Sequence, residues 1–159
     1  MDPVEFRRWY DTVANDLHRY VRRLADSVDE AEDLFQETLA RFLGSGFDSD
    51  DLAQRRRYLF RIATNLARDR QRRSRRWILG SLVERSGDAP EQGYSDRINV
   101  QRALARLPRR SRALLWLAYV EGMEHREIAE IVGVASKSVR VLLSRARKSL
   151  LRNLERSDR

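Results

Sequence analysis

Apolar residues recur along the chain at intervals of three and four positions, and strict alternation of apolar and polar residues is nearly absent. This spacing is typical of amphipathic helices, whereas half-buried strands show a two-residue period. The pattern therefore predicts an all-α protein. It predicts helices over residues 3–24 and 29–43, a third that ends near 76, and four more over 98–107, 109–121, 125–132 and 136–154.

The second predicted helix has the most complete amphipathic pattern. It ends at Gly44-Ser45-Gly46, a cluster that breaks helices. Asp48, Ser49 and Asp50 follow, and side chains of these types cap helix N-termini, so we expect them to begin the third helix. The apolar positions of the second helix are Ala31, Leu34, Phe35, Thr38, Leu39 and Phe42.

Residues 80–96 differ from the rest of the chain. They contain three of the seven glycines and one of the three prolines, and they show no apolar period. Such a composition is typical of a flexible linker. The sequence therefore predicts two small helical domains, at 1–79 and 97–159.

The last two predicted helices resemble a helix-turn-helix. Gly133 lies where the chain must reverse, a position that favours glycine. The inward positions would be Ile128, Ile131 and Val132 on the first helix and Val139, Leu143, Ala146 and Leu150 on the second. The outer face of the second helix is basic and fits the major groove of DNA. The alternative is a helical hairpin that only packs within a bundle. The outer face comprises Lys137, Arg140, Val141, Ser144 and Lys148, with Ser138 and Arg145 at its edge.

Two positions weaken this local pattern. Glu124 and Ala135 occupy sites where serine or threonine would cap the two helices. A missing cap typically costs ~0.5–2 kcal/mol. Tertiary packing is expected to offset that cost.

Composition narrows the possible functions. The 159 residues contain 32 basic and 24 acidic side chains, no cysteine and two histidines. Disulfides, thiolate zinc sites and cysteine nucleophiles are excluded, and no metal site or cofactor is expected. The longest apolar run, Ala113–Val120, is too short to span a bilayer, and the N-terminus does not resemble a signal peptide. We therefore expect a soluble, cytoplasmic protein with a polyanionic partner.

The charges are segregated along the chain. Residues 55–76 contain ten arginines and one acidic residue, and residues 140–152 contain five bases and no acid. Residues 29–37 contain five acids and no base. Any one run could be an ordinary solvated helix face. Together, the two basic blocks and the separate acidic block indicate two contacts with nucleic acid and one with a basic protein surface.

The acidic block lies opposite the apolar stripe of its helix, at Glu32, Asp33, Gln36 and Glu37. Paired carboxylates can catalyse acid–base chemistry, but that requires a pocket. Here we expect a solvent-exposed face with no local basic partner to relieve its repulsion. Such a face suits docking on a basic protein. The alternative is a solvated face without a partner.

The arginine-rich helix also carries Tyr58, Phe60 and Asn65 near its start. Aromatic side chains beside arginines can hold unstacked bases, at ~1–3 kcal/mol per base. The alternative is that both aromatic residues belong to the core, and this alternative is favoured for Phe60.

Together these segments resemble the extracytoplasmic-function sigma factors, over nearly the whole chain. EAEDLFQETLARF (30–42) resembles the family's helix that binds core RNA polymerase. RRYLFRIATNLARDRQRR (56–73) resembles its -10 recognition and melting helix. The segment from ALARLPRRSRALL to RARKSL (103–150) resembles its -35-binding domain.

The resemblance implies roles for individual residues. Glu32, Asp33, Gln36 and Glu37 would contact the clamp coiled coil of the polymerase β′ subunit, and the C-terminal domain would meet the β flap. The loop 44–54 would hold a flipped base, with Phe47 as a contact. The -10 strand would be held by Tyr58, Arg61, Asn65, Arg68, Arg72 and Arg73. The -35 element would be read by Ser136, Lys137, Ser138, Arg140, Ser144 and Arg145.

The implied partners are core RNA polymerase, promoter DNA in duplex and single-stranded form, and an anti-sigma factor. No catalytic residue is implied, and the protein is not expected to be an enzyme or to insert into membranes. Departures from the family pattern are Glu124, Ala135 and Leu142. Many relatives carry arginine in place of Leu142, and the resemblance implies a -35 phosphate contact for that arginine.

Two other functions remain possible on the residues alone. A transcriptional regulator could use only the helix-turn-helix, which leaves the acidic and arginine-rich helices unexplained. A nuclease would need a metal or general-base cluster, and the carboxylates here are expected on one exposed face.

Overall fold

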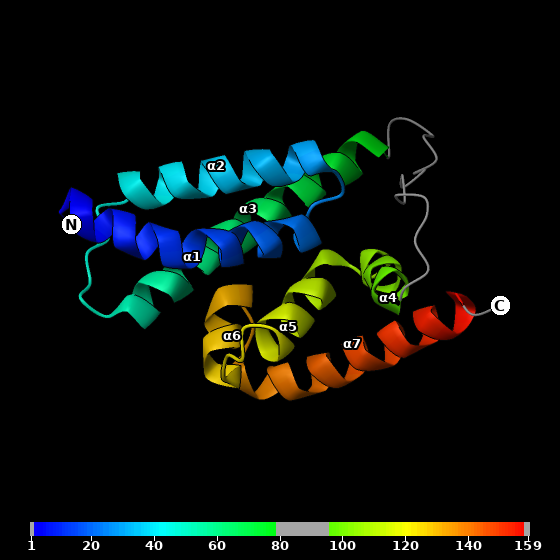
Figure 1. The fold of residues 1–159 in the computed structure, drawn as a ribbon. Coiled ribbons are helices and arrows are strands. Elements are labelled where there is room, and N and C mark those ends of the chain that lie inside the picture. The colour runs from blue at the N-terminus through cyan, green and yellow to red at the C-terminus, as the bar shows by residue number, and fades with distance from the viewer. Residues whose placement is uncertain (1, 79–95, 158–159) are drawn as a thin grey trace.

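The computed structural model of the chain describes residues 2–78 and 96–157, all of whose regular elements are helices. The expected helices are confirmed, with ends shifted by a few residues (Figure 1). The predicted linker lies outside the described residues, apart from Asp96, which begins a helix. The helices are α1 (Pro3–Leu24), α2 (Val28–Gly44), α3 (Leu52–Ile78), α4 (Asp96–Ala105), α5 (Arg109–Tyr119), α6 (His125–Val132) and α7 (Ser136–Ser157).

Helices α1, α2 and α3 form a three-helix bundle, which we call the N-terminal half (Figure 1). Leu17, Leu34 and Phe60 are fully buried at its centre, so Phe60 is a core residue, as the sequence favoured. The hydroxyl groups of Tyr20 and Thr64 are 2.7 Å apart and join α1 to α3. Burial raises the pKa of Tyr20, which keeps this phenol protonated.

Helices α4 to α7 form the C-terminal half, with α7 packed against the other three. Ile128 and Ile131 on α6 and Val139 on α7 are buried as expected, against Leu114 and Leu117 on α5. The apolar spacing thus identified the inward faces of both helices in the helix-turn-helix.

The two halves also pack against each other, which the sequence did not indicate. Helix α3 contacts α6, and α1 contacts α5. Buried side chains of both halves belong to one hydrophobic cluster. The relative position of the two halves therefore matters for any surface near their junction.

The start of α3 differs from the prediction. The side chain that caps the N-terminus of α3 is that of Asp51. Its Oδ1 accepts hydrogen bonds from the backbone N–H groups of Ala53 at 2.9 Å and Gln54 at 3.4 Å. The expectation that Asp48, Ser49 or Asp50 would cap the helix is wrong. Ser49 instead accepts from the N–H of Asp51, and this bond shapes the turn that precedes the helix.

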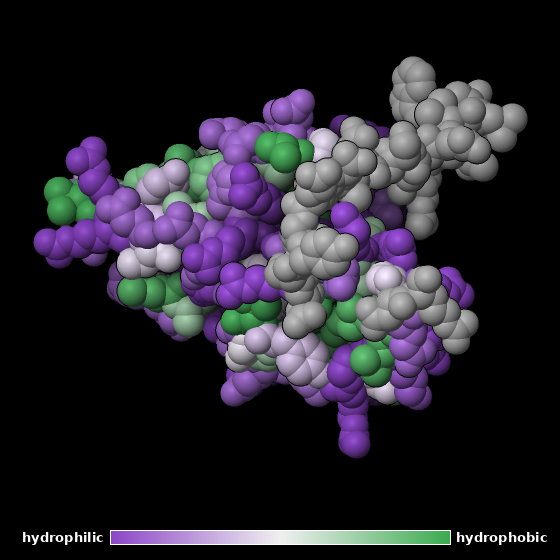
Figure 2. Space-filling model, turned by 45° about the vertical axis from the view of Figure 1, so that its right-hand side comes forward, coloured by the Kyte–Doolittle hydropathy of each residue, from purple (hydrophilic) through white to green (hydrophobic). Residues whose placement is uncertain are grey.

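None of the described helices is both long and apolar enough to cross a membrane. Figure 2 shows hydrophilic side chains over much of the face in view, with apolar residues in small separate areas. That distribution fits a highly charged chain with a small core.

Candidate functional site

The acidic face of α2 is accessible to a partner. Its direction is fixed by Leu34, Phe35 and Thr38, which are buried on the opposite side of the helix. Asp33 is the most exposed of the carboxylates, with 74% of its side chain accessible. Glu32 and Gln36 are also exposed, and Glu37 is half-buried. The four residues thus form one outward surface, as the helical spacing predicted.

This face has basic neighbours, contrary to the expectation that it has none. Glu37 accepts hydrogen bonds from Arg41 at 2.8 Å and from Arg70 at 2.9 Å. Arg70 also lies 3.8 Å from Asp33, and His18 lies 2.7 Å from Glu32. Since α2 packs beside α3, an arginine 33 residues later in the chain reaches the acidic face. The face is therefore partly neutralised at one edge, while Asp33 remains open to solvent.

The hydrogen bond from Arg70, more than that from Arg41, lowers the pKa of Glu37. A carboxyl whose pKa is lower in the folded chain stabilises the fold above its unfolded pKa. That contribution is lost as pH falls through the folded pKa. We expect Arg70→Gln to raise the pKa of Glu37 towards its ordinary value, as measured by side-chain NMR titration. Arg8→Gln is the control, since Arg8 is exposed on α1 and makes no ion pair among the described residues. An unchanged Glu37 titration in Arg70→Gln would contradict this assignment.

The arginines of α3 that were predicted to bind DNA point outward. Arg61, Arg68, Arg72 and Arg73 are exposed, and Asn65 is half-buried between them. Arg68 donates to Oδ1 of Asn65 at 3.2 Å, which holds the amide in place. The opposite face contributes Leu59, Ala63 and Leu66 to the core. Helix α3 thus presents a basic, solvent-accessible row suited to phosphates.

The loop before α3 brings together two aromatic residues that the sequence had placed near DNA. The rings of Phe47 and Tyr58 stack with centroids 4.3 Å apart and planes inclined by 22°. Phe42 and Trp9 lie behind them, with centroids 4.9 Å apart. Both Phe47 and Tyr58 are half-buried, so part of each side chain is accessible. This arrangement can accept an unstacked base against a supported ring.

The helix-turn-helix has the expected geometry at its turn. Gly133 has φ +79°, a left-handed conformation that favours glycine. It ends α6, and α7 begins three residues later. The reading residues lie on the accessible side of α7: Ser136, Lys137, Arg140 and Arg145 are exposed, while Ser138 and Ser144 are half-buried.

The sequence had indicated that α6 lacks an N-terminal cap at Glu124, but the structure shows a capping interaction there. The backbone N–H of Glu124 donates to Oε2 of Glu127 at 3.0 Å, which is one half of a capping box. Glu127, three residues after Glu124, is the glutamate of a capping-box pattern, so this cap was predictable from the sequence. At Ala135 only the backbone carbonyl accepts, from the N–H of Ser138 at 2.9 Å.

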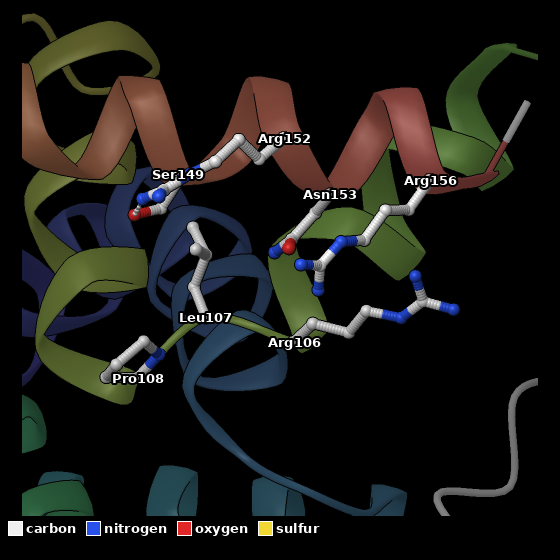
Figure 3. Close-up of a pocket in the computed structure, with 7 residues that line it drawn as sticks. All are labelled: Arg106, Leu107, Pro108, Ser149, Arg152, Asn153 and Arg156. Carbon is white, nitrogen blue, oxygen red and sulfur yellow. Dashed lines mark hydrogen bonds between the residues drawn. The ribbon is translucent and has the colours of Figure 1, made fainter.

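A basic pocket on the flank of α7 was not anticipated. Its volume is about 230 Å³, and it lies between the C-terminal half of α7 and the turn that joins α4 to α5 (Figure 3). Arg106, Arg152 and Arg156 line it together with Asn153 and Ser149, and none of its lining residues is acidic. Arg152 donates to Ser149 at 3.1 Å. The pocket extends the basic side of α7 and suits a single anionic group.

Two predicted surfaces meet at the junction of the halves. Arg68 and Arg72 of α3 line a cavity of about 160 Å³ together with Gly133 and Val134 of the helix-turn-helix. Nη1 of Arg68 lies 3.7 Å from the point that a side chain at Gly133 would occupy. Part of the basic row on α3 therefore faces the C-terminal half.

The described residues contain no cluster of three or more histidine, aspartate or glutamate side chains arranged to hold a metal ion. Three surfaces remain as candidates for function: the acidic face of α2, the basic row of α3 with its aromatic stack, and the reading face of α7. Two of them suit DNA and one suits a basic protein.

Comparison with known proteins identifies the family. The family model for Sigma-70 region 2 matches residues 9–77, and that for Sigma-70 region 4 matches residues 97–150. The ECF RNA polymerase sigma factor SigL of Mycobacterium tuberculosis is 34% identical over 158 residues, which cover 94% of this chain and 88% of SigL. The chain belongs to the ECF RNA polymerase sigma factors.

Other sigma factors match over similar lengths. SigC of Mycobacterium tuberculosis is 32% identical over 90% of this chain and 80% of its own length. SigM of Bacillus subtilis is 25% identical over 89% of this chain and 90% of its own length. The region 2 match covers the acidic and arginine-rich helices, which a regulator with only a helix-turn-helix leaves unexplained. This sigma factor therefore functions in transcription initiation.

A solved relative shares the fold of both halves. RpoE from Bartonella quintana, crystallised in complex with the anti-sigma factor NepR, is 26% identical with a TM-score of 0.78. The superposition covers 95% of this chain and 97% of RpoE. The PhyRSL–NepR complex from Sphingomonas sp. Fr1 matches at 19% identity and a TM-score of 0.64, which concerns the fold alone.

Proposed function

We propose that this sigma factor acts as a non-catalytic subunit that gives core RNA polymerase its choice of promoter. The observation that carries the proposal is the accessibility of the acidic face of α2, the basic row of α3 and the reading face of α7 in one chain. Each surface has a chemistry that suits one partner of a transcription complex. The proposed site of action is the cytoplasm, where polymerase and promoter DNA meet.

The acidic face is proposed to bind the clamp coiled coil of the polymerase β′ subunit. Asp33 is its centre because it is the most exposed carboxylate and faces away from the bundle. Glu32, Gln36 and Glu37 surround it. Charge complementarity of this kind orients an encounter and contributes most when the pair becomes desolvated.

The basic row of α3 is proposed to hold the non-template strand of the -10 element. Arg61, Arg68, Arg72 and Arg73 would contact phosphates, while Asn65, held by Arg68, would face a base. The aromatic stack of Phe47 and Tyr58 would support a base that leaves the duplex. Binding of the unstacked base offsets the few kcal/mol that unstacking costs.

The reading face of α7 is proposed to bind the -35 element in the major groove. Lys137 and Arg140 are exposed in its first turns, where recognition helices contact base edges. Ser136, Ser138, Ser144 and Arg145 complete the contact. Val141 is exposed on the same face and can meet a thymine methyl group. The C-terminal half is also proposed to contact the polymerase β flap.

An anti-sigma factor is proposed as a further partner. The support is the relative RpoE, whose structure was solved in complex with the anti-sigma factor NepR. The surfaces proposed to bind polymerase and DNA are accessible here and could be covered by such a protein.

Run-off transcription with purified core polymerase over a library of promoter sequences tests the proposal. We expect transcripts that depend on added sigma factor and that share two elements upstream of the start site. Core polymerase alone is the control. Equal transcription with and without the protein would overturn the proposal.

The aromatic stack gives a separate prediction. Phe47→Ala in the holoenzyme should weaken binding of a single-stranded -10 oligonucleotide by up to ~1–3 kcal/mol, because one stacking surface is lost. Phe47→Trp is the control, since it keeps an aromatic face. Fluorescence anisotropy measures the affinity, and thermal unfolding reports any loss of packing against Phe42 and Tyr58. A loss of stability without loss of oligonucleotide affinity would assign Phe47 to the core only.

A further inference from the structure

The basic pocket on the flank of α7 is separate from the residues proposed to read bases. Recognition helices contact base edges with their N-terminal residues, and the proposed reading residues of α7 end at Arg145. Ser149, the first residue of α7 that lines the pocket, lies ~20 Å along the helix from Ser136 at 1.5 Å per residue. Promoter reading therefore leaves the pocket without a role.

The walls of the pocket are fixed by contacts within the C-terminal half. The side-chain amide of Asn153 on α7 donates to the backbone carbonyl of Ala103 on α4 at 3.1 Å. The buried side chain of Arg112 donates through Nε to the backbone carbonyl of Leu107 at 3.0 Å. Leu107 is buried, so the turn between α4 and α5 is held at both its side chain and its backbone. The pocket is thus formed before any ligand binds.

Three arginines line the pocket without a carboxylate partner. Arg106 lies in the turn after α4, and Arg152 and Arg156 lie one turn apart on α7. Within residues 2–78 and 96–157 none of the three forms an ion pair, and no acidic residue lines the pocket. Arg156 extends from α7 toward the turn that carries Arg106 (Figure 3). Like charges that share a pocket repel one another, so a bound anion stabilises the group.

The polar atoms of the pocket are suited to an acceptor ligand. A guanidinium group has five N–H donors and no acceptor. The carbonyl of Leu107 already accepts from Arg112. Ser149 accepts from Arg152 at 3.1 Å, which leaves the hydroxyl proton of Ser149 available to donate. The pocket therefore favours a ligand with several anionic oxygens.

The directions of these donors favour phosphate over carboxylate. The three arginines reach the pocket from two elements, the turn and α7. A carboxylate accepts hydrogen bonds close to one plane, whereas a phosphate carries its oxygens in a tetrahedron and accepts from several directions.

Charge and size narrow the ligand further. A single phosphate carries about −1.5 to −2 at pH 7, and two phosphate groups carry roughly −3, which matches the charge of the three arginines. The pocket volume of about 230 Å³ is below the ~300–1,000 Å³ of pockets that enclose drug-sized ligands. It can therefore hold the phosphate end of a molecule, but not an additional nucleoside.

We propose that this pocket binds the diphosphate group of a small anion through Arg106, Arg152 and Arg156. Two sources supply that group, free inorganic diphosphate and the diphosphate end of a nucleotide, and the chemistry at the pocket is the same for both. The bound group bridges α7 to the turn between α4 and α5. Binding therefore stabilises the C-terminal half against unfolding, and it does so whether or not the chain binds a promoter.

Titration of the full-length chain with sodium diphosphate at constant ionic strength, followed by ¹H–¹⁵N NMR, tests the proposal. We expect saturable shifts of the backbone amide of Leu107 and the side-chain amide of Asn153, which report on the two sides of the pocket. Orthophosphate, with half the phosphate groups, should bind about fivefold more weakly or worse. ADP that binds as tightly as diphosphate, with AMP weaker, identifies nucleotides as a source. Weaker binding of ADP identifies free diphosphate.

Arg106→Gln and Arg156→Gln each remove one charge, from opposite sides of the pocket. Arg126→Gln is the matched control, because Arg126 is exposed on α6 and forms no ion pair among the described residues. We expect each pocket variant to lower the affinity for diphosphate by about fivefold or more, and Arg126→Gln to leave it unchanged. Circular dichroism checks that all three variants remain helical. Shifts at the basic row of α3 are expected to be the same in every variant.

Two results would overturn the proposal. One is the absence of saturable shifts at Leu107 and Asn153 with diphosphate. The other is an equal loss of affinity in Arg126→Gln and the pocket variants, which would mark general charge attraction.

Thermal unfolding provides a second measurement. At a hundredfold excess of diphosphate over its Kd, the Tm of the wild type should rise by about 5 °C or more. Sodium sulfate at the same ionic strength is the control, because such salts stabilise folded proteins without a specific site. The rise should be smaller in Arg106→Gln and Arg156→Gln. A rise of the same size in sulfate or in the pocket variants would contradict a specific site.

Discussion

Asp33→Arg is expected to abolish co-purification of this sigma factor with core RNA polymerase. Asp33 is the most exposed carboxylate of the acidic face, and within the fold the substitution disturbs only its 3.8 Å ion pair with Arg70. In the proposed complex it would place a positive charge against a basic surface. Disruption of a desolvated charge pair costs about 2–5 kcal/mol, and a charge reversal adds repulsion. The affinity for core polymerase should therefore fall by a factor of roughly 30 or more.

The control for this variant is Asp11→Arg, which changes the net charge equally at an exposed position on α1. Pull-down with tagged core polymerase and a titration by fluorescence anisotropy measure the two affinities. Circular dichroism should show the same helix content for both variants and the wild type. Retention of core polymerase by Asp33→Arg at the wild-type level would contradict the docking role of α2.

The helices and their inward faces were predictable from local spacing. On α2, Leu34 and Phe35 are buried where the three- and four-residue spacing placed them, because a helix repeats every 3.6 residues. Gly133 was equally readable, since few other residues adopt a left-handed turn. The acidic face followed from the same argument, as the side of α2 opposite its buried stripe.

Contacts between distant segments were not predictable. Residues 55–76 contain ten arginines. Nothing in their spacing shows that Arg70 donates a hydrogen bond to Glu37 on α2. Arg109 and Arg112 also read as surface charges, yet both are buried against Asp26. An ion pair across more than eighty residues depends on how helices pack, and a single sequence does not encode that packing in its local pattern.

For the candidate DNA-binding surfaces, the sequence predicted the residues but not their neighbours in the fold. The sequence assigned Tyr58 and, through the family resemblance, Phe47 to contacts with bases, but it did not show that their rings stack on each other. It placed Arg68 and Arg72 on the outer face of α3 but could not show that the helix-turn-helix lies beside them. The local sequence determines which side chains lie on the outer face of a helix. Tertiary packing determines which other element covers that face.

Arg140→Ala is expected to relax the choice of -35 sequence. Arg140 is exposed on the second turn of α7, and its neighbours Val139 and Leu143 anchor the opposite side of the helix in the core. From this position a guanidinium can donate two hydrogen bonds to a guanine in the major groove. Loss of such a contact should cost ~1–3 kcal/mol at one base position, a factor of roughly 5 to 150 in affinity for the preferred sequence. Competition binding of holoenzyme to a -35 library measures it.

Arg152→Ala provides the comparison, because it removes the same charge from the same helix at an exposed position on the flank of α7. If Arg152 meets DNA only through a phosphate, its loss should weaken all library members equally and lower the salt dependence of binding. Arg140→Ala should instead lower the affinity for the preferred base more than for the other three, because only a base-edge contact distinguishes them. An equal loss over the whole library would reassign Arg140 to the phosphate backbone and leave specificity to Lys137 and the serines of the same face.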